Sequence, residues 1–115
     1  MNIEEFREYC LSKKGVSEDL PFDETTLVFK VGNKMFALTD LEEIPVRFNL
    51  KCEPERAIEL REDYEGIVPG WHMNKKHWNT VYGEKDVPDS SIMELTDHSY
   101  DLVFNGLKKK LNKRY

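Results

Sequence analysis

The residues best suited to chemistry lie together in one short segment, PGWHMNKKHWNTV, at positions 69–81. The segment contains both tryptophans of the chain and two of its three histidines, beside two lysines and two asparagines. Lysines contact phosphates, asparagines pair with base edges, and exposed tryptophans stack on bases. The same residue types also occur in metal sites, catalytic pockets and loops fixed by buried rings. Spacing separates some of these alternatives.

Histidine spacing argues against a metal site in this segment. His72 and His77 are five residues apart, which turns them about 140° from each other on a helix and places them on opposite faces of a strand. No carboxylate lies within 69–81 to complete a site. We therefore expect neither a metal nor a cofactor.

The chain also lacks a recognisable arrangement for nucleophilic catalysis. His98 precedes Ser99, but neighbours on a helix do not face each other. There is no GxSxG elbow and no glycine-rich phosphate loop. The sequence predicts a non-enzymatic protein without catalytic residues.

Two binding roles come first, one with DNA and one with another protein, and a small-molecule-binding or enzymatic role comes third. The net charge of −5 argues against strong nonspecific binding to nucleic acid, which needs a basic surface. A basic face would need residues 66–83 and the KKKLNKR end at 108–114, whereas residues 53–65 sum to −4. If that acidic stretch borders the lysines, a protein-interaction role gains over DNA. The candidate contacts for DNA or a partner are Arg47, Lys51, His72, Asn74, Lys75, Lys76, His77 and Asn79. The lysines near the C-terminus are candidates for additional, outer contacts.

Elements at the start of the chain would build one side of a sheet. Asn2 and Glu5 have the spacing of a capping box, which predicts a helix that Gly15 ends. A short extended stretch through Leu20 and Phe22 is expected as an edge strand.

The clearest hairpin is LVFKVGNKMFALT at 27–39, because its central Gly-Asn pair suits a two-residue turn. Simple pairing across that turn sets Phe29 opposite Phe36 and Leu27 opposite Leu38, as one row facing the core.

The elements after the hairpin alternate between strands and helices. A strand at 46–52 alternates, with one apolar face and a mildly basic face made of Arg47, Asn49 and Lys51. Pro54 suits the first turn of a helix over 54–65. A strand is expected from His77 to Tyr82, and a final helix from Asp89 or Ser90 onward, in which the pattern allows a break near Thr96–Asp97.

These elements fit one compact α+β domain over residues 1–115. Cys10 and Cys52 have no metal-finger spacing and are expected as small buried hydrophobes. The absence of a signal peptide and of a long apolar run predicts a cytoplasmic protein with no membrane contact. We expect a monomer or a weak dimer.

Three motifs carry a resemblance to a known family: KCEPE (51–55), IVPGWHMNKKHWNTV (67–81) and HSYDLV (98–103). In that order and over nearly the whole chain, the sequence resembles the MmcQ/YjbR family of small bacterial proteins. Trp71 stands where the family often has tyrosine. The resemblance implies an antiparallel sheet packed against helices in the order α-β(3–4)-α-β-α, similar to type III secretion chaperones and CyaY-like proteins.

The resemblance also implies a function and a division of roles. The family's usual label is a DNA-binding protein with a double-wing motif, and the alternative is a chaperone-like interaction module that uses an exposed sheet face. None of the matching residues is implied to be catalytic. We expect Trp78 and the Pro69–Gly70 turn to fix a loop that presents Asn74, Lys75 and Lys76. The residues expected to be structural are Pro69, Gly70, Trp71, Trp78, Ser99 and Tyr100.

Overall fold

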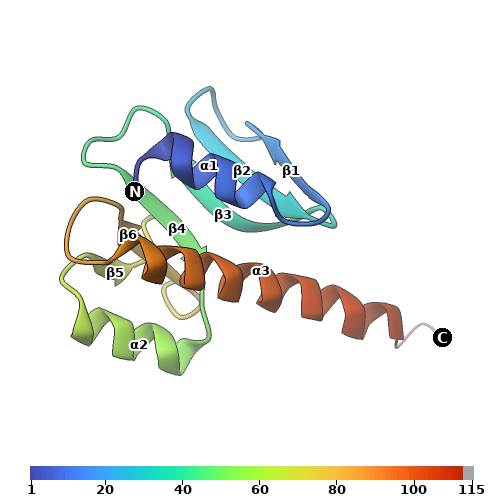
Figure 1. Ribbon diagram of the computed structural model, residues 1–115. Helices are drawn as coiled ribbons and strands as arrows, with labels where there is room; N and C mark the ends of the chain where they lie inside the picture. Colours follow the sequence, from blue (N-terminus) through green and yellow to red (C-terminus); the bar gives the residue numbers. More distant parts are fainter. Residues whose placement is uncertain (113–115) are drawn as a thin grey trace.

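The computed structural model describes residues 1–112 and the side chains of residues 1–109, and this part of the chain forms three helices and six strands (Figure 1). In chain order they are α1 (Ile3–Leu11), β1 (Val16–Asp19), β2 (Thr26–Val31), β3 (Lys34–Asp40), β4 (Arg47–Lys51), α2 (Pro54–Asp63), β5 (Ile67–Pro69), β6 (Trp78–Tyr82) and α3 (Asp89–Asn112). The fold is α+β, as predicted, with β5 as an additional short strand. No helix in the described part of the chain is long and apolar enough to cross a membrane.

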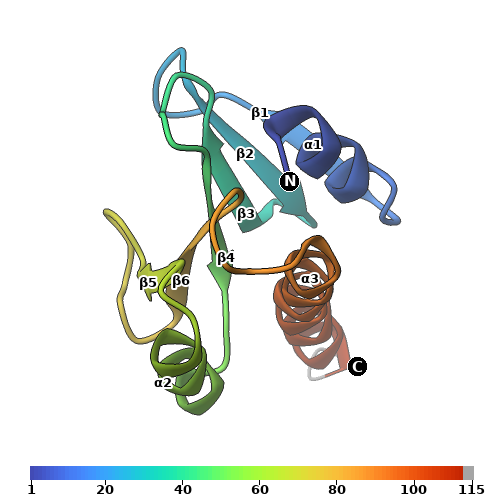
Figure 2. The ribbon, with the colours of Figure 1, turned by 60° about the vertical axis from the view of Figure 1, so that its left-hand side comes forward.

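The strands form one antiparallel sheet in the order β1-β2-β3-β4-β6-β5. Figures 1 and 2 show α1 and α3 on the same side of this sheet, while α2 lies beside β5 at the far edge. We call the surface of β2, β3, β4 and β6 that faces away from α1 and α3 the open face. The C-terminal part of α3 projects past the sheet (Figure 1).

Local signals in the sequence explain where the helices begin. The side chain of Asn2 accepts from the Glu5 N–H at 2.8 Å, and the Glu5 carboxylate accepts from the Asn2 N–H, which confirms the capping box. Pro54 occupies the first turn of α2, also as predicted. The final helix runs without the break allowed near Thr96, whose hydroxyl donates to the Ile92 carbonyl within the helix. The last part of the expected apolar stripe, at Leu111, lies outside the described side chains.

The register of the central hairpin differs from the predicted one. Its turn pairs Val31 with Lys34 as expected, but a bulge then sets Phe29 opposite Ala37 rather than Phe36. An extra residue on one strand reverses which face the following side chains take. Phe36 and Ala37 therefore both join the helix-side core, while Leu38 points to the open face.

The first strand comes earlier than predicted. β1 ends at Asp19, and both Leu20 and Phe22 lie exposed in the loop that follows, so their assignment to a strand is wrong. The carboxylate of Asp23 accepts from the N–H groups of Thr25 and Thr26, and this turn occupies the backbone just before β2 begins.

Burial divides the apolar residues between the two faces of the sheet. On the helix side, Phe6 stacks on Phe48 with ring centroids 3.9 Å apart and meets Phe29 edge-on. On the open face a smaller cluster joins Val28, Leu38 and Trp78. Cys10 and Cys52 are free and buried, as predicted.

Candidate functional site

Residues 70–77 form a loop between β5 and β6 that is bonded to the open face, and we call it loop 70–77. The Trp71 N–H donates to Oγ1 of Thr80 at 2.9 Å, and that hydroxyl donates to Oδ1 of Asn49 at 2.6 Å. Nδ2 of Asn49 donates back to the Trp71 carbonyl at 3.2 Å. This closed circuit fixes the start of the loop to β4 and β6.

Gly70 and Trp78 pack together where the loop leaves the sheet. The Gly70 N–H donates to the Trp78 carbonyl at 2.9 Å, and Pro69 is the last residue of β5. A Cβ at position 70 would lie 2.8 Å from Cβ of Trp78 and 3.0 Å from its carbonyl oxygen. Only glycine fits here without a shift of the loop. Trp78 itself is 8% exposed, so its ring belongs to the scaffold rather than to the surface.

Asn79 does not lie where a base or partner could reach it. The side chain is 2% exposed, its oxygen accepts from Nε of Arg61 at 2.7 Å, and its amide donates to the Ala57 carbonyl. Its expected role as a contact is therefore wrong. The residue type suggested base pairing, but α2 packs over this side chain and uses both of its polar ends.

The polar residues in the middle of loop 70–77 are partly committed to holding its shape. Oδ1 of Asn74 accepts from the Lys76 N–H, and its backbone carbonyl accepts from the N–H groups of His77 and Trp78. Nζ of Lys75 donates to the Gly70 carbonyl at 2.9 Å. The side chain of Lys76 is exposed, and that of His77 is half-buried.

The remaining motif residues on α3 connect this helix to the sheet. The Ser99 hydroxyl donates to the Phe36 carbonyl and accepts from the Lys51 N–H at 2.9 Å, so it bridges β3 and β4. The Tyr100 hydroxyl donates to the Lys14 carbonyl at 2.6 Å. Nε2 of His98 accepts from the Glu53 N–H at the start of α2, and partial burial lowers the pKa of His98.

The predicted basic residues divide into two groups at opposite ends of β4. Arg47 pairs with Tyr82 in the register, whereas Lys51 pairs with Trp78, so the two cations start about 13 Å apart at roughly 3.3 Å per residue. Lys75 and Lys76 lie at the Lys51 end, because loop 70–77 returns there to β6. Arg47 is isolated from them.

The acidic helix α2 borders the lysine group. Its Arg61 donates to the Lys75 carbonyl, which puts α2 directly against loop 70–77. The same helix exposes Glu55, Glu59 and Glu62. The terminal lysines Lys108 and Lys109 are exposed on α3, while Lys110 and the residues after it lie outside the described side chains.

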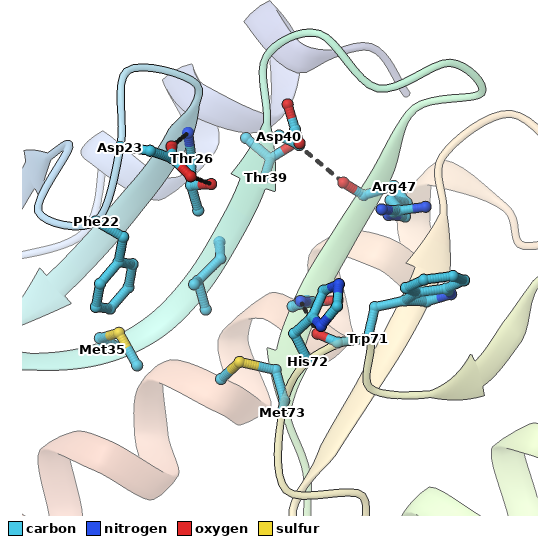
Figure 3. Close-up of a pocket in the computed structure, with 12 residues that line it drawn as sticks. Phe22, Asp23, Thr26, Met35, Thr39, Asp40, Arg47, Trp71, His72 and Met73 are labelled. Atoms are coloured by element: carbon cyan, nitrogen blue, oxygen red, sulfur yellow. Dashed lines mark hydrogen bonds between the residues drawn. The ribbon is translucent and has the colours of Figure 1, made fainter.

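The open face is hollowed into a pocket of about 510 Å³ between loop 70–77 and the loop that precedes β2 (Figure 3). Phe22 stands on one side of it and Trp71 on the other, 64% and 47% exposed respectively. Figure 3 shows the sulfur-bearing side chains of Met35 and Met73 below them. The other lining residues are Asp23, Thr26, Leu38, Thr39, Asp40, Arg47, Asn49 and His72.

Loop 70–77 places Trp71 and His72 in this pocket through an unusual backbone. His72 has a φ of +56°, which is uncommon for a residue with a side chain and turns the chain back over the sheet. The Trp71 ring lies 4.8 Å from the guanidinium of Arg47, in cation–π contact. Arg47 is also paired with Glu43 at 2.9 Å, so its charge is compensated.

Comparison with known proteins shows to which family this chain belongs. The YjbR family model matches residues 11–102, which is most of the chain. The chain belongs to the YjbR family. It is 35% identical over 113 residues to the protein YjbR of Escherichia coli strain K12, covering 98% of this chain and 96% of that protein. YbdF of Escherichia coli O157:H7 is 39% identical over 95 residues, which cover 82% of this chain and 77% of YbdF.

Solved structures agree with the fold. The crystal structure of the Deinococcus radiodurans protein DR2400, of domain family DUF419, superposes with a TM-score of 0.85 at 44% identity. It covers 89% of this chain and 78% of its own. A Pseudomonas syringae protein has a TM-score of 0.78 at 29% identity, covering 90% of this chain and 99% of its own. These comparisons establish the family and the fold.

The sequence of this YjbR-family chain does not predict much of its pocket. It places Phe22 in a strand, and no pattern marks Asp23, Asp40 or Met35 as site residues. The DETT run at 23–26 did carry a signal, because Asp followed by Thr favours a turn that ends a strand early. Among the described residues, no three His, Cys, Asp or Glu side chains are grouped closely enough to hold a metal ion.

Proposed function

We propose that this YjbR-family protein is a non-enzymatic interaction module that binds a segment of another protein in the open-face pocket. The observation that carries the proposal is the pair of exposed aromatic side chains, Phe22 and Trp71, on either side of a 510 Å³ hollow. Exposed aromatic rings around a concave apolar floor are typical of protein-binding surfaces. We assign the protein to the cytoplasm in this proposal, since free buried cysteines suit a reducing compartment.

The extent of the exposed apolar surface supports a protein segment over a small ligand. Leu41 is exposed and Ile44 is 90% exposed in the loop between β3 and β4. The Leu41 N–H donates to the Thr25 carbonyl at 2.8 Å, which joins that loop to the one bearing Phe22. This loop therefore adds exposed apolar side chains outside the pocket, where Leu41 and Ile44 line a separate hollow beside Ile3 at the start of α1.

Photocrosslinking tests this proposal. Benzoylphenylalanine in place of Phe22 keeps an aromatic ring at the pocket, and in place of Ile58 it gives a matched exposed position on α2. We expect a crosslinked protein from position 22 and none from position 58. The crosslink should disappear when Met35→Arg fills the pocket. Equal crosslinking at both positions, or a crosslink that survives Met35→Arg, would contradict the proposal.

DNA binding is a second candidate, supported by the grouping of Lys51, Lys75 and Lys76 at one end of the sheet. Against it are the burial of Asn79, the acidic helix α2 beside these lysines, and the isolation of Arg47. We expect weak, salt-dependent binding at most.

Fluorescence anisotropy with duplex DNA over a salt series tests the second candidate. Each phosphate contact should contribute a slope of about −0.9 in log K against log salt. Lys75→Ala/Lys76→Ala should then flatten the slope by about two units at most, while Lys14→Ala/Lys85→Ala, which removes two exposed lysines elsewhere, should not. No binding at low salt would rule out DNA binding as a function of this surface.

A further inference from the structure

The charges around the open-face pocket have one predominant sign. Two segments meet at this end of the sheet, the end of β1 with the loop after it (residues 19–24) and the end of β3 with the loop after it (residues 40–43). Each carries three acidic residues and no lysine or arginine. The bond from the Leu41 N–H to the Thr25 carbonyl at 2.8 Å holds them side by side. This end of the sheet therefore carries six carboxylates.

Two of these carboxylates line the pocket itself. Asp23 stays ionised, because hydrogen bonds from Thr26 and Thr25 hold its pKa below the usual range. Oδ1 of Asp40 accepts from the Glu42 N–H. Figure 3 shows both carboxylates at the upper end of the hollow, Asp23 in the loop before β2 and Asp40 at the end of β3. The pocket's one arginine, Arg47, is neutralised by Glu43, which leaves the lining net negative.

Beside the carboxylates, the pocket offers exposed apolar surface. Phe22 is 64% exposed above the half-buried Met35 and Met73. Thioether side chains adapt to ligands of different shape. A phosphate-bearing ligand fits this combination poorly, because its charge would face Asp23 and Asp40.

We propose that the pocket takes a cationic segment of a partner protein, with a lysine or arginine beside an apolar residue. The cation faces Asp23 and Asp40, and the apolar side chain lies between Phe22 and the two methionines. Electrostatic complementarity of this kind selects the partner and speeds the encounter. The inference rests on the proposed function, since it names the chemistry of the segment that the pocket would bind.

Three synthetic 12-residue peptides with identical leucine and phenylalanine positions test this inference. Their remaining positions are filled with arginine, glutamine or glutamate. Each is titrated at low salt into the ¹⁵N-labelled full chain, and the amide shifts of Thr26, Leu38, Asn49 and Trp71 report on the pocket. We expect the arginine peptide to shift these amides and to bind about tenfold more tightly than the glutamine peptide, and the glutamate peptide not to bind.

Charge-removing variants identify which carboxylates act. Asp23→Asn/Asp40→Asn keeps the acceptor oxygens that hold the two turns but removes both charges. Exposed ion pairs contribute a factor of roughly two to five each, so affinity for the arginine peptide should fall about five- to tenfold. Glu59→Gln/Glu62→Gln makes the same change in net charge on α2, where both residues are exposed, and should leave affinity within about twofold.

The outcomes separate this inference from the function on which it rests. If the glutamine and arginine peptides bind the pocket equally, the cationic preference is wrong and the interaction module stands. A preference for the glutamate peptide, or equal losses in the two double variants, would also overturn the preference alone. If no peptide shifts the pocket amides, both the preference and the pocket as an interaction site fail.

Discussion

The two faces of the sheet in this YjbR-family protein use aromatic residues in opposite ways. On the helix side, Phe6, Phe29 and Phe48 are fully buried and contact one another through stacked and edge-on rings. On the open face Trp71 and Phe22 stay exposed around a pocket (Figure 3). Burial of large apolar groups is the main source of stability, whereas uncovered aromatic groups contribute little to it. The main core and the proposed interaction site therefore lie on opposite faces of the sheet.

Phe48→Ala should have the largest effect on stability and gives the strongest test of this separation. Phe48 is stacked on Phe6, and the backbone at Gly83 fits closely against its ring, so truncation leaves a cavity. We expect the free energy of unfolding to fall by about 3–5 kcal/mol, measured by urea denaturation. Phe22→Ala removes the same ring on the open face and should change it by less than about 0.5 kcal/mol. Comparable losses would mean that the two faces are not separated.

Trp78→Ala measures how much the buried cluster on the open face contributes to the free energy of unfolding. Trp78 packs with Val28 and Leu38 under loop 70–77, so we expect a loss of about 3 kcal/mol, the low end for a buried aromatic residue. Trp71→Ala, the matched change on the exposed ring, should cost about 0.5–1 kcal/mol through loss of the Arg47 contact. Urea denaturation followed by far-UV circular dichroism measures both. A loss below 1 kcal/mol for Trp78→Ala would mean that the Trp78 ring is not part of the core.

Gly70→Ala tests whether tight packing extends under loop 70–77. The added Cβ would meet Trp78 at 2.8 Å, and overpacking of this kind costs about 1–3 kcal/mol. Gly106 in α3 is the control, because a Cβ there meets nothing within 4 Å. Gly106→Ala should stabilise the protein by about 0.5–1 kcal/mol through helix propensity. If both substitutions stabilise, the loop is free to shift and the pocket wall is not rigid.

These expectations use features that the sequence made visible only in part. Strand β4 and the Gly-Asn turn were predictable, because alternation and turn residues are local signals. The bulge in β3 was not, since Phe36 and Ala37 are both apolar and nothing in the pattern says that both face the helices. Because of the extra residue at the bulge, Leu38 faces the open side of the sheet, where it lines the pocket.

The candidate site shows the same limit more strongly. The 69–81 segment stood out by composition, and its scaffold residues Gly70 and Trp78 were expected. The exposure of Phe22 depends on a turn, and the burial of Asn79 depends on Arg61, a residue 18 positions away on another element. Composition located the wall of the pocket, but the partners that complete it come from elements distant in the sequence.

Acidification should produce the smallest change in the free energy of unfolding, and that change should come from the helix side of the sheet. Nε2 of His98 accepts from the Glu53 N–H, which only the unprotonated ring can do, and burial lowers the pKa of His98 below 6.5. The unfolded chain therefore binds this proton at higher pH than the folded chain, so the contribution is complete above about pH 6.5 and is lost as pH falls through the lower folded pKa. We expect the urea midpoint to fall from pH 7.5 to 5.5 by less than the equivalent of about 1 kcal/mol, the net value of one hydrogen bond. His98→Gln should reduce this pH dependence. If the pH dependence of His98→Gln equals that of the unmodified protein, the bond between His98 and Glu53 is not its source.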